Sequence, residues 1–229
     1  MKKLLFILVI FLPAHLLFAG EFWVGTTQGL NLSQVSFVPT VKQSYLSGYN
    51  GGIVARYISE PNLGLQAELN FSQRGWSEKH DDTGSIHRRM NYVELPVMTH
   101  IYFGKRAFRC FVNLGPKIGF FTGENKPAIG NNPTVIEPAE PDTAPVIMPD
   151  DRFYRFNEPV NLKFDYAIVG GVGFGLQFRR FFYQVEGRYG FGLGDFFDSE
   201  KNSKNEKANP YSRSAFRTVS VNFSILYKL

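Results

Sequence analysis

The stretch Phe164–Phe178, FDYAIVGGVGFGLQF, alternates between two kinds of side chain. Its even positions are aromatic or aliphatic except for Gly170, whereas its odd positions are mostly small, with the polar Asp165 and Gln177 near the two ends. Successive side chains of a β-strand point to opposite faces, so this period of two predicts a strand with one apolar face. The fold then depends on whether that face points outward or into a core.

The same alternation recurs along the chain and predicts eight strands, at about 22–32, 47–58, 63–75, 89–103, 107–122, 161–178, 181–193 and 214–229. The connections differ sharply in length: 59–62, 104–107 and 179–180 are short, whereas 33–46, 76–88, 123–160 and 194–213 are long. An even strand number, with short turns at one end and long loops at the other, is typical of bacterial outer-membrane barrels. The pattern predicts an all-β fold, an eight-stranded antiparallel up-and-down transmembrane β-barrel.

Aromatic residues gather at the strand ends on the apolar parity, as they do in the girdles of a transmembrane barrel. One set flanks the short turns (Tyr57, Phe103, Phe108, Phe178, Phe181) and another lies at the opposite end (Phe71, Phe120, Phe164, Tyr166, Tyr189, Phe191). An apolar stretch of about ten residues in a tilted strand spans roughly 25 Å of bilayer. These features favour an apolar face in contact with lipid. The alternative is a soluble, lipocalin-like carrier whose apolar face lines the interior.

The N-terminal residues MKKLLFILVIFLPAHLLFAG predict a secretory signal peptide. Two lysines precede an apolar run that ends near Phe18, and the small Ala19 follows. We expect cleavage after residue 19 and a single exported domain over 20–229; an uncleaved anchor is the alternative. Cys110 is the only cysteine, so an intrachain disulfide is excluded. The formal charge of +5 is too small to indicate nucleic acid as a partner.

The longest connection, 123–160, contains seven of the 13 prolines and has seven acidic residues against three basic ones. Such a segment cannot bury enough apolar surface to fold alone, so we expect an external loop. Loops held by a rigid scaffold often carry binding residues. Aromatic side chains near or on the long loops are therefore candidate contacts for a partner, or else part of the outer girdle: Trp76, Phe153, Tyr154, Phe156, Phe196, Phe197 and Tyr211.

Strand parity also predicts a set of charged side chains that point into the barrel: Arg56, Glu68, Glu94, Arg109, Lys117, Asp165, Glu186 and Arg188, with His100 as a further candidate. An eight-stranded barrel is only wide enough for its own side chains. Buried charges must then pair with one another. We expect a structural network of ion pairs; the alternative is a narrow gated channel or transporter that uses these charges.

Evidence for catalysis or metal binding is weak. His80 and His87 lie near Glu78, Asp81, Asp82 and Ser85, where a metal site or a weak catalytic cluster is conceivable, but a solvated loop explains them equally well. The run GGVGFG at 170–175 lies within a strand rather than between a strand and a helix, which argues against a dinucleotide site. We expect no catalytic residue, no cofactor and no metal.

Four segments resemble the PorT-type outer-membrane β-barrel family: GLQAELNFSQRG at 64–75, NYVELP at 91–96, FVNLGPKIG at 111–119 and NFSILYKL at 222–229. The resemblance implies an eight-stranded outer-membrane barrel of mostly unknown role, with one family member associated with a secretion and gliding machinery. It suggests a structural or interaction protein, accessory to a secretion apparatus and binding through its external loops. The partners that this implies are outer-membrane lipid and other envelope proteins, and no nucleic acid.

Overall fold

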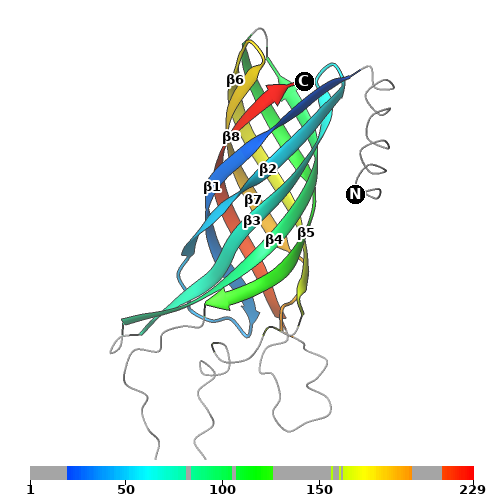
Figure 1. Ribbon diagram of the computed structural model, residues 1–229. Coiled ribbons are helices and arrows are strands. Elements are labelled where there is room, and N and C mark those ends of the chain that lie inside the picture. Colours follow the sequence, from blue (N-terminus) through cyan, green and yellow to red (C-terminus); the bar gives the residue numbers. More distant parts are fainter. Residues whose placement is uncertain are drawn as a thin grey trace, which may run out of the picture.

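The computed structural model describes residues 20–80, 84–104, 107–125, 156, 160, 162–197 and 213–229. Eight antiparallel strands in chain order form one closed barrel (Figure 1), which confirms the predicted fold class. The strands are β1 (Glu21–Val38), β2 (Leu46–Glu60), β3 (Leu63–His80), β4 (Gly84–Phe103), β5 (Phe108–Asn125), β6 (Phe164–Phe178), β7 (Phe181–Gly192) and β8 (Arg213–Lys228).

The first and last strands close the barrel. β1 pairs with β2 on one side and with β8 on the other, and the β1–β8 register runs from Trp23 opposite Lys228 to Val38 opposite Arg213. Each strand therefore has a partner on both sides, and the backbone N–H and C=O groups of a paired strand bond within the sheet. Closure of this kind is what allows strands to cross lipid, where water cannot satisfy a free edge.

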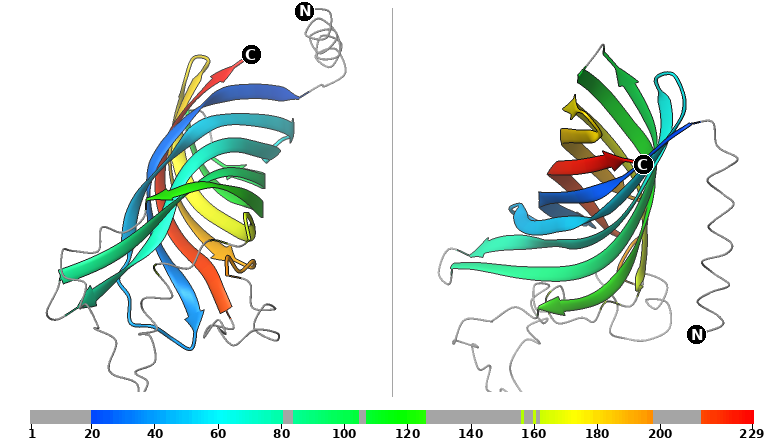
Figure 2. Two further views of the ribbon diagram at one scale, coloured as in Figure 1. Left: turned by 60° about the horizontal axis from the view of Figure 1, so that its bottom comes forward. Right: turned by 45° about the horizontal axis from the view of Figure 1, so that its top comes forward.

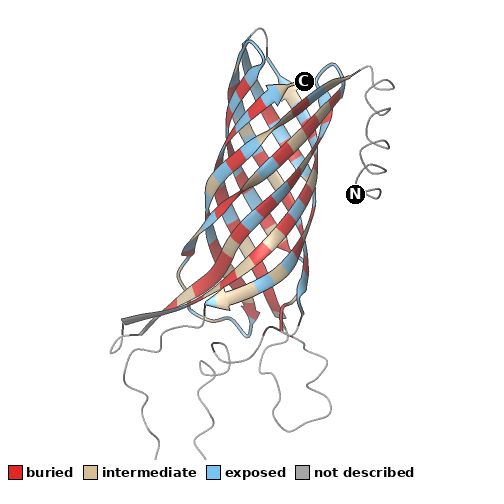
Figure 3. Ribbon diagram, in the orientation of Figure 1, coloured by how far each residue is buried: buried red, intermediate tan, exposed pale blue. Residues whose placement is uncertain are grey.

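Buried residues alternate with more exposed ones along most of the described length of the strands (Figure 3). In β6, Tyr166, Val172 and Leu176 are about half exposed or more, whereas Asp165 and Val169 are buried. The apolar face is thus the outer face, as predicted. A lipocalin-like carrier would line its interior with this face, so that alternative is wrong.

The short connections are tight turns at one end of the barrel, where β1 begins and β8 ends (Figure 1). Each contains one residue with positive φ: Asn62 at 72°, Gly104 at 133° and Arg179 at 53°. Glycine is required at 104, because a Cβ atom there would lie 2.4 Å from the carbonyl oxygen of Phe108. We call this the short-turn end and the opposite one the long-loop end.

At the long-loop end, β1, β3, β4 and β5 are longer than the sequence pattern predicts, whereas β6 and β7 are slightly shorter. β3 continues to His80 and β4 begins at Gly84, so most of the expected loop at 76–88 is a β-hairpin that extends past the neighbouring strands (Figure 2). The connection between β1 and β2 supports it: Ser44 and Ser77 exchange two backbone hydrogen bonds, at 2.7 and 3.3 Å. The loop prediction was wrong here because residues 77–88 are mostly polar and do not show the apolar alternation from which a strand is predicted.

The predicted signal peptide, 1–19, lies outside the described residues, and so does most of the acidic connection at 123–160. Both remain predictions. Among the residues that are described, no helix has the length and apolar character needed to span a membrane.

Val172 tests the assignment of the outer face. It is 64% exposed and lies in the middle of β6, opposite Val112 of β5 and Gly187 of β7. We expect Val172→Arg to destabilise the barrel in phospholipid vesicles by about 2–4 kcal/mol, because it places a charge near the bilayer midplane. Urea titration measures the loss, and Val172→Leu, which keeps an apolar side chain, is the control. Equal stability of the two variants would contradict a lipid-facing Val172.

Candidate functional site

The interior of the barrel is filled by three successive layers of side chains. At the short-turn end an apolar cluster, the short-turn plug, consists of Trp23, Val54, Ile58, Phe111, Phe182 and Leu226. At the long-loop end a larger one, the long-loop plug, consists of Val35, Phe37, Trp76, Met90, Tyr92, Phe156, Val160, Phe196, Phe197 and Phe216. Between them lies a layer of buried polar and charged side chains, which is the candidate site.

Arg188 of β7 is the centre of one ion-pair group in the polar layer. Its Nη1 and Nη2 atoms donate to the two carboxylate oxygens of Glu68 at 2.7 and 2.6 Å, and Nη2 also donates to Glu186 at 2.7 Å. Glu68 accepts two more hydrogen bonds, from Gln66 at 2.5 Å and from Asn70 at 2.8 Å. Paired charges with several hydrogen bonds of this kind offset much of the cost of burial.

Arg74 of β3 is the centre of a second group, nearer the long-loop end. It lies 3.0 Å from a carboxylate oxygen of Glu94 and donates to Asp165 at 2.7 Å. Lys117 contacts the two oxygens of Glu94 at 3.2 Å each. The guanidinium carbon of Arg74 also lies 4.0 Å from the ring centroid of Tyr92. The polar layer and the long-loop plug are therefore joined through this arginine.

Arg56 of β2 joins the polar layer to the short-turn plug without a carboxylate contact. It donates to the side-chain oxygens of Gln66 and Gln184 at 2.5–2.8 Å, and its guanidinium carbon lies 5.6 Å from the ring centroid of Phe182. His100 is buried beside it, with its Nδ1 atom 2.7 Å from the side-chain oxygen of Asn113.

Arg109 corrects part of the sequence prediction. It is only half-buried and lies near the short-turn end, with its guanidinium carbon 4.9 Å from the ring centroid of Tyr102. Within the described part of the chain it forms no ion pair. The physical reason is depth: at the barrel mouth water still reaches the guanidinium, so no carboxylate is needed.

Charges inside the described barrel balance. The buried cations are Arg56, Arg74, Arg88, Lys117 and Arg188, and the buried carboxylates are Glu68, Glu78, Glu94, Asp165 and Glu186, which makes five of each. An electrically neutral and internally bonded layer offers little attraction for an ion of either sign. This balance favours a structural role for the lumen charges.

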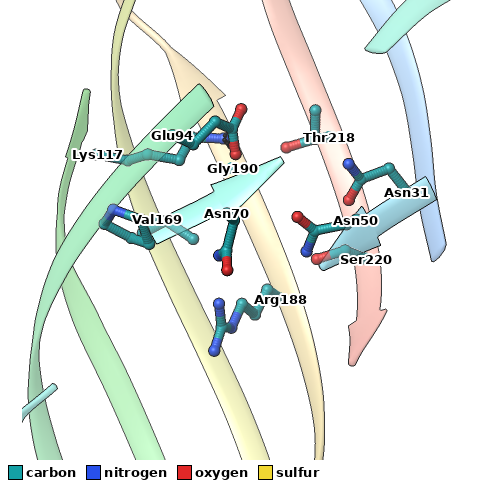
Figure 4. A pocket seen from close by; sticks show the side chains of 11 residues that line it. Asn31, Asn50, Asn70, Glu94, Lys117, Val169, Arg188, Gly190, Thr218 and Ser220 are labelled. Atoms are coloured by element: carbon teal, nitrogen blue, oxygen red, sulfur yellow. Dashed lines mark hydrogen bonds and ion pairs between the residues drawn. The ribbon is translucent and has the colours of Figure 1, made fainter. Parts of the chain in front are cut away.

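Free space in the polar layer is small. A cavity of about 20 Å³ lies among side chains of both ion-pair groups, including Glu94, Lys117 and Arg188, with Asn70 beside them and Asn31 and Asn50 across from them (Figure 4). A cavity needs at least about 10–15 Å³ to hold one water molecule, so this one has room for about one. That is too small for an organic substrate or a continuous column of water.

Trp76 and Phe156 were expected among the exposed loop contacts, and the structure corrects this. Trp76 is fully buried in β3, and Phe156 is 6% exposed. The ring of Trp76 stacks on Phe156 and Phe196 at centroid distances of 5.6 and 5.8 Å, and Phe37 meets it edge-on at 5.4 Å. Together with the fully buried Phe197, these rings fill the long-loop end. Three other expected contacts, Phe153, Tyr154 and Tyr211, lie outside the described residues.

The chain around Phe196 and Phe197 is tied to the start of β8. The backbone N–H of Phe197 donates to the hydroxyl of Ser214 at 3.0 Å, and the backbone N–H of Ser214 donates to the carboxylate of Asp195 at 2.6 Å. Arg88, also buried here, pairs with Glu124 at 2.6 Å. These bonds hold the long-loop plug in place.

Arg74 and Arg88 were missed at the sequence level. Both have the inward parity: Arg74 follows Gln66, Glu68, Asn70 and Ser72 on the same face of β3. Continuing the even positions of β3 past residue 73 would have placed Arg74 and Trp76 inside. Which carboxylate each arginine meets could not be read from parity, because the contacts depend on the register of neighbouring strands and, for Arg74 and Asp165, on a contact across the lumen.

His87 and His100, whose side chains the structure describes, do not form a common centre. His87 is exposed on β4, opposite Ser77 of β3, and the side chain of His80 is outside the described part. No three His, Cys, Asp or Glu side chains come together as metal ligands among the described residues.

Comparison with known proteins gives one family match. The model of the family described as outer membrane protein beta-barrel domain matches residues 17–198. No curated protein matches the chain.

Several solved structures are similar to the chain. Neisserial surface protein A is 10% identical with a TM-score of 0.45, covering 91% of this chain and 97% of its own. Outer membrane protein W of E. coli is 16% identical with a TM-score of 0.45, and the match covers 93% of this chain and 100% of that protein's chain. Ail, the attachment invasion locus protein of Yersinia pestis, is 10% identical with a TM-score of 0.40, covering 91% and 99%.

Arg188 allows a direct test of the buried network. We expect Arg188→Met to destabilise the barrel by about 3–5 kcal/mol, because it leaves Glu68 and Glu186 buried without their cation. The triple variant Arg188→Met, Glu68→Gln, Glu186→Gln removes the unpaired charges and should recover most of that loss. Urea titrations in the same detergent compare them, and a triple variant as unstable as the single one would contradict the ion-pair assignment.

Proposed function

Because the chain belongs to the family of outer membrane protein beta-barrel domains, we propose that it is an integral outer-membrane scaffold that acts through contacts made outside its lumen. In this class of barrel the short turns face the periplasm and the long loops face the exterior. The short-turn end is then periplasmic and the long-loop end external.

The filled lumen carries this proposal. Aromatic plugs occupy both ends, and the polar layer between them is charge-balanced and contains a cavity with room for about one water molecule. A transport path would need a continuous polar route, and apolar constrictions oppose the passage of ions. We therefore favour a structural or interaction role over a narrow gated channel.

Apolar side chains at the external rim support a contact surface there. Val38, Tyr45, Leu162 and Leu193 are 43–54% exposed and lie at strand ends or beyond them at the long-loop end. The β3–β4 hairpin extends from the same end (Figure 2). Exposed apolar residues beyond the aromatic band have no lipid to cover them, so a partner protein is a suitable cover.

We further propose that this partner is another envelope protein, with the barrel an accessory of a secretion apparatus. The proposal rests on the PorT-type resemblance of segments 64–75, 91–96, 111–119 and 222–229, which fall in β3, β4, β5 and β8. The absence of enzymatic activity remains a prediction.

Planar-bilayer recording tests the closed lumen. We expect the purified chain to show no single-channel steps at any voltage that the bilayer tolerates, because both plugs must open before ions pass. Lys117→Gln, which removes one charge beside the cavity, should be equally silent. Steps in the unmodified chain whose ion selectivity changes in Lys117→Gln would overturn the scaffold proposal in favour of a channel.

Crosslinking in intact cells tests where partners bind. A photoreactive residue at Tyr45 or Leu193, on the external rim, should give a crosslinked envelope protein, because these side chains are exposed there. The same substitution at Phe103, exposed at the periplasmic end, is the matched control and should give none or a different product. Products at Phe103 alone would contradict an external contact surface.

A further inference from the structure

Two arginines lie on the outer wall of the barrel at its external end. Arg213 and Arg217 of β8 share the outward face that continues as Val219, Val221 and Phe223, and Arg217 is opposite Phe191 of β7. The guanidinium carbons of both lie 5.7 Å from the ring centroid of Phe191. They are therefore at most 11.4 Å apart, close enough to serve one head group.

Neither arginine is neutralised by the described part of the chain. The interior cations Arg74, Lys117 and Arg188 each have carboxylate partners, whereas Arg213 and Arg217 form no ion pair among the described residues. The Nε atom of Arg217 is buried and has no hydrogen-bond partner. A half-buried cation of this kind needs either water, as Arg109 has at the barrel mouth, or a counter-ion from outside the chain.

The depth of the two arginines along the barrel axis indicates which part of the membrane surrounds them. Phe191 belongs to the external aromatic band, together with Tyr189 of β7 and Phe164 and Tyr166 of β6. Aromatic bands lie at the level of the lipid head groups. The two guanidinium groups therefore lie at the boundary between lipid tails and head groups, in the outer leaflet. The guanidinium fork matches the geometry of phosphate, to which it donates two hydrogen bonds at once.

We propose that Arg213 and Arg217 form a binding site for a phosphate-bearing lipid of the outer leaflet, with Phe191 supporting both guanidinium groups. The lipid supplies the missing counter-charge and accepts hydrogen bonds from the unpartnered donors. This site rests on placement in the outer membrane and on no partner protein, so it stands or falls separately from the external contact surface.

The chain offers a matched control for this site. Arg179 and Arg180 form the turn between β6 and β7, at the periplasmic end of the same wall. Arg179 also lies beside an aromatic ring, 5.6 Å from the centroid of Phe178, and Arg180 donates to the hydroxyl of Tyr227 at 3.3 Å. One double variant combines Arg213→Gln with Arg217→Gln, and the other combines Arg179→Gln with Arg180→Gln. The two variants therefore remove the same charge from opposite ends of the barrel.

Native mass spectrometry of the full chain in an uncharged detergent measures binding, with diphosphoryl lipid A as the probe and its dephosphorylated form as the comparison. We expect the Arg213/Arg217 variant to bind diphosphoryl lipid A at least about tenfold more weakly than the unmodified chain, and the Arg179/Arg180 variant to bind as the unmodified chain does. The dephosphorylated form should bind weakly to all three. The difference should shrink at high salt, as expected for partly exposed charges.

Other outcomes overturn the proposal. Equal binding by the unmodified chain and the Arg213/Arg217 variant would mean that these side chains simply reach to water. Equal losses in both double variants would mean non-specific attraction to basic residues, and displacement of the glycolipid by an equal concentration of inorganic phosphate would mean a free-anion site. Heat-dependent gel mobility must first show that each variant is folded. If the Arg213→Gln, Arg217→Gln variant is not folded, the Arg213→Lys, Arg217→Lys variant takes its place. It keeps the charge but loses the guanidinium fork, so it should also bind diphosphoryl lipid A more weakly than the unmodified chain.

Discussion

Everything else in the structure depends on the hydrogen-bonded ladder between β1 and β8. Without water to bond to, a strand in lipid must have a partner on each side, and only closure provides this for the first and last strands. Closing after eight strands in turn fixes the width of the lumen, which leaves space for side chains and little more. The crowded interior is thus a consequence of strand number, and the apolar exterior is a consequence of lipid.

The narrow lumen lets buried charges bond across it as well as along one strand, as Arg188 does with Glu186. Glu68 of β3 meets Arg188 of β7, four strands away in the sheet order and therefore on the opposite wall. Arg56 of β2 reaches Gln184 of β7 in the same way. Such contacts tie opposite walls together at a fixed distance, and each is costly to break because the surviving partner stays buried. The network therefore supports the cross-section of the barrel as much as it neutralises charge.

Much of this arrangement follows from the alternation of side chains along a strand, which has a period of two residues. Alternation predicts the number of strands, the outward face of β6 and the inward direction of Glu68, Lys117 and Arg188, because a strand has only two faces. Contacts across the lumen could not be predicted, since they depend on how far each strand is shifted against the next. The long-loop end was the least predictable part: Trp76 stands among polar residues, and only its parity on β3 indicates that it points inward.

Arginine shows how one side chain takes different roles at different depths. Arg188, fully enclosed, has its carboxylates within the chain; Arg109, at the mouth, is partly hydrated and lies against Tyr102. Arg213 and Arg217 face outward beside Phe191 of the external aromatic band, and neither has a carboxylate partner in the described part of the chain. A lumen whose buried charges balance offers an external ligand little attraction. Binding is therefore to be sought on the outer wall and the external rim rather than in the lumen.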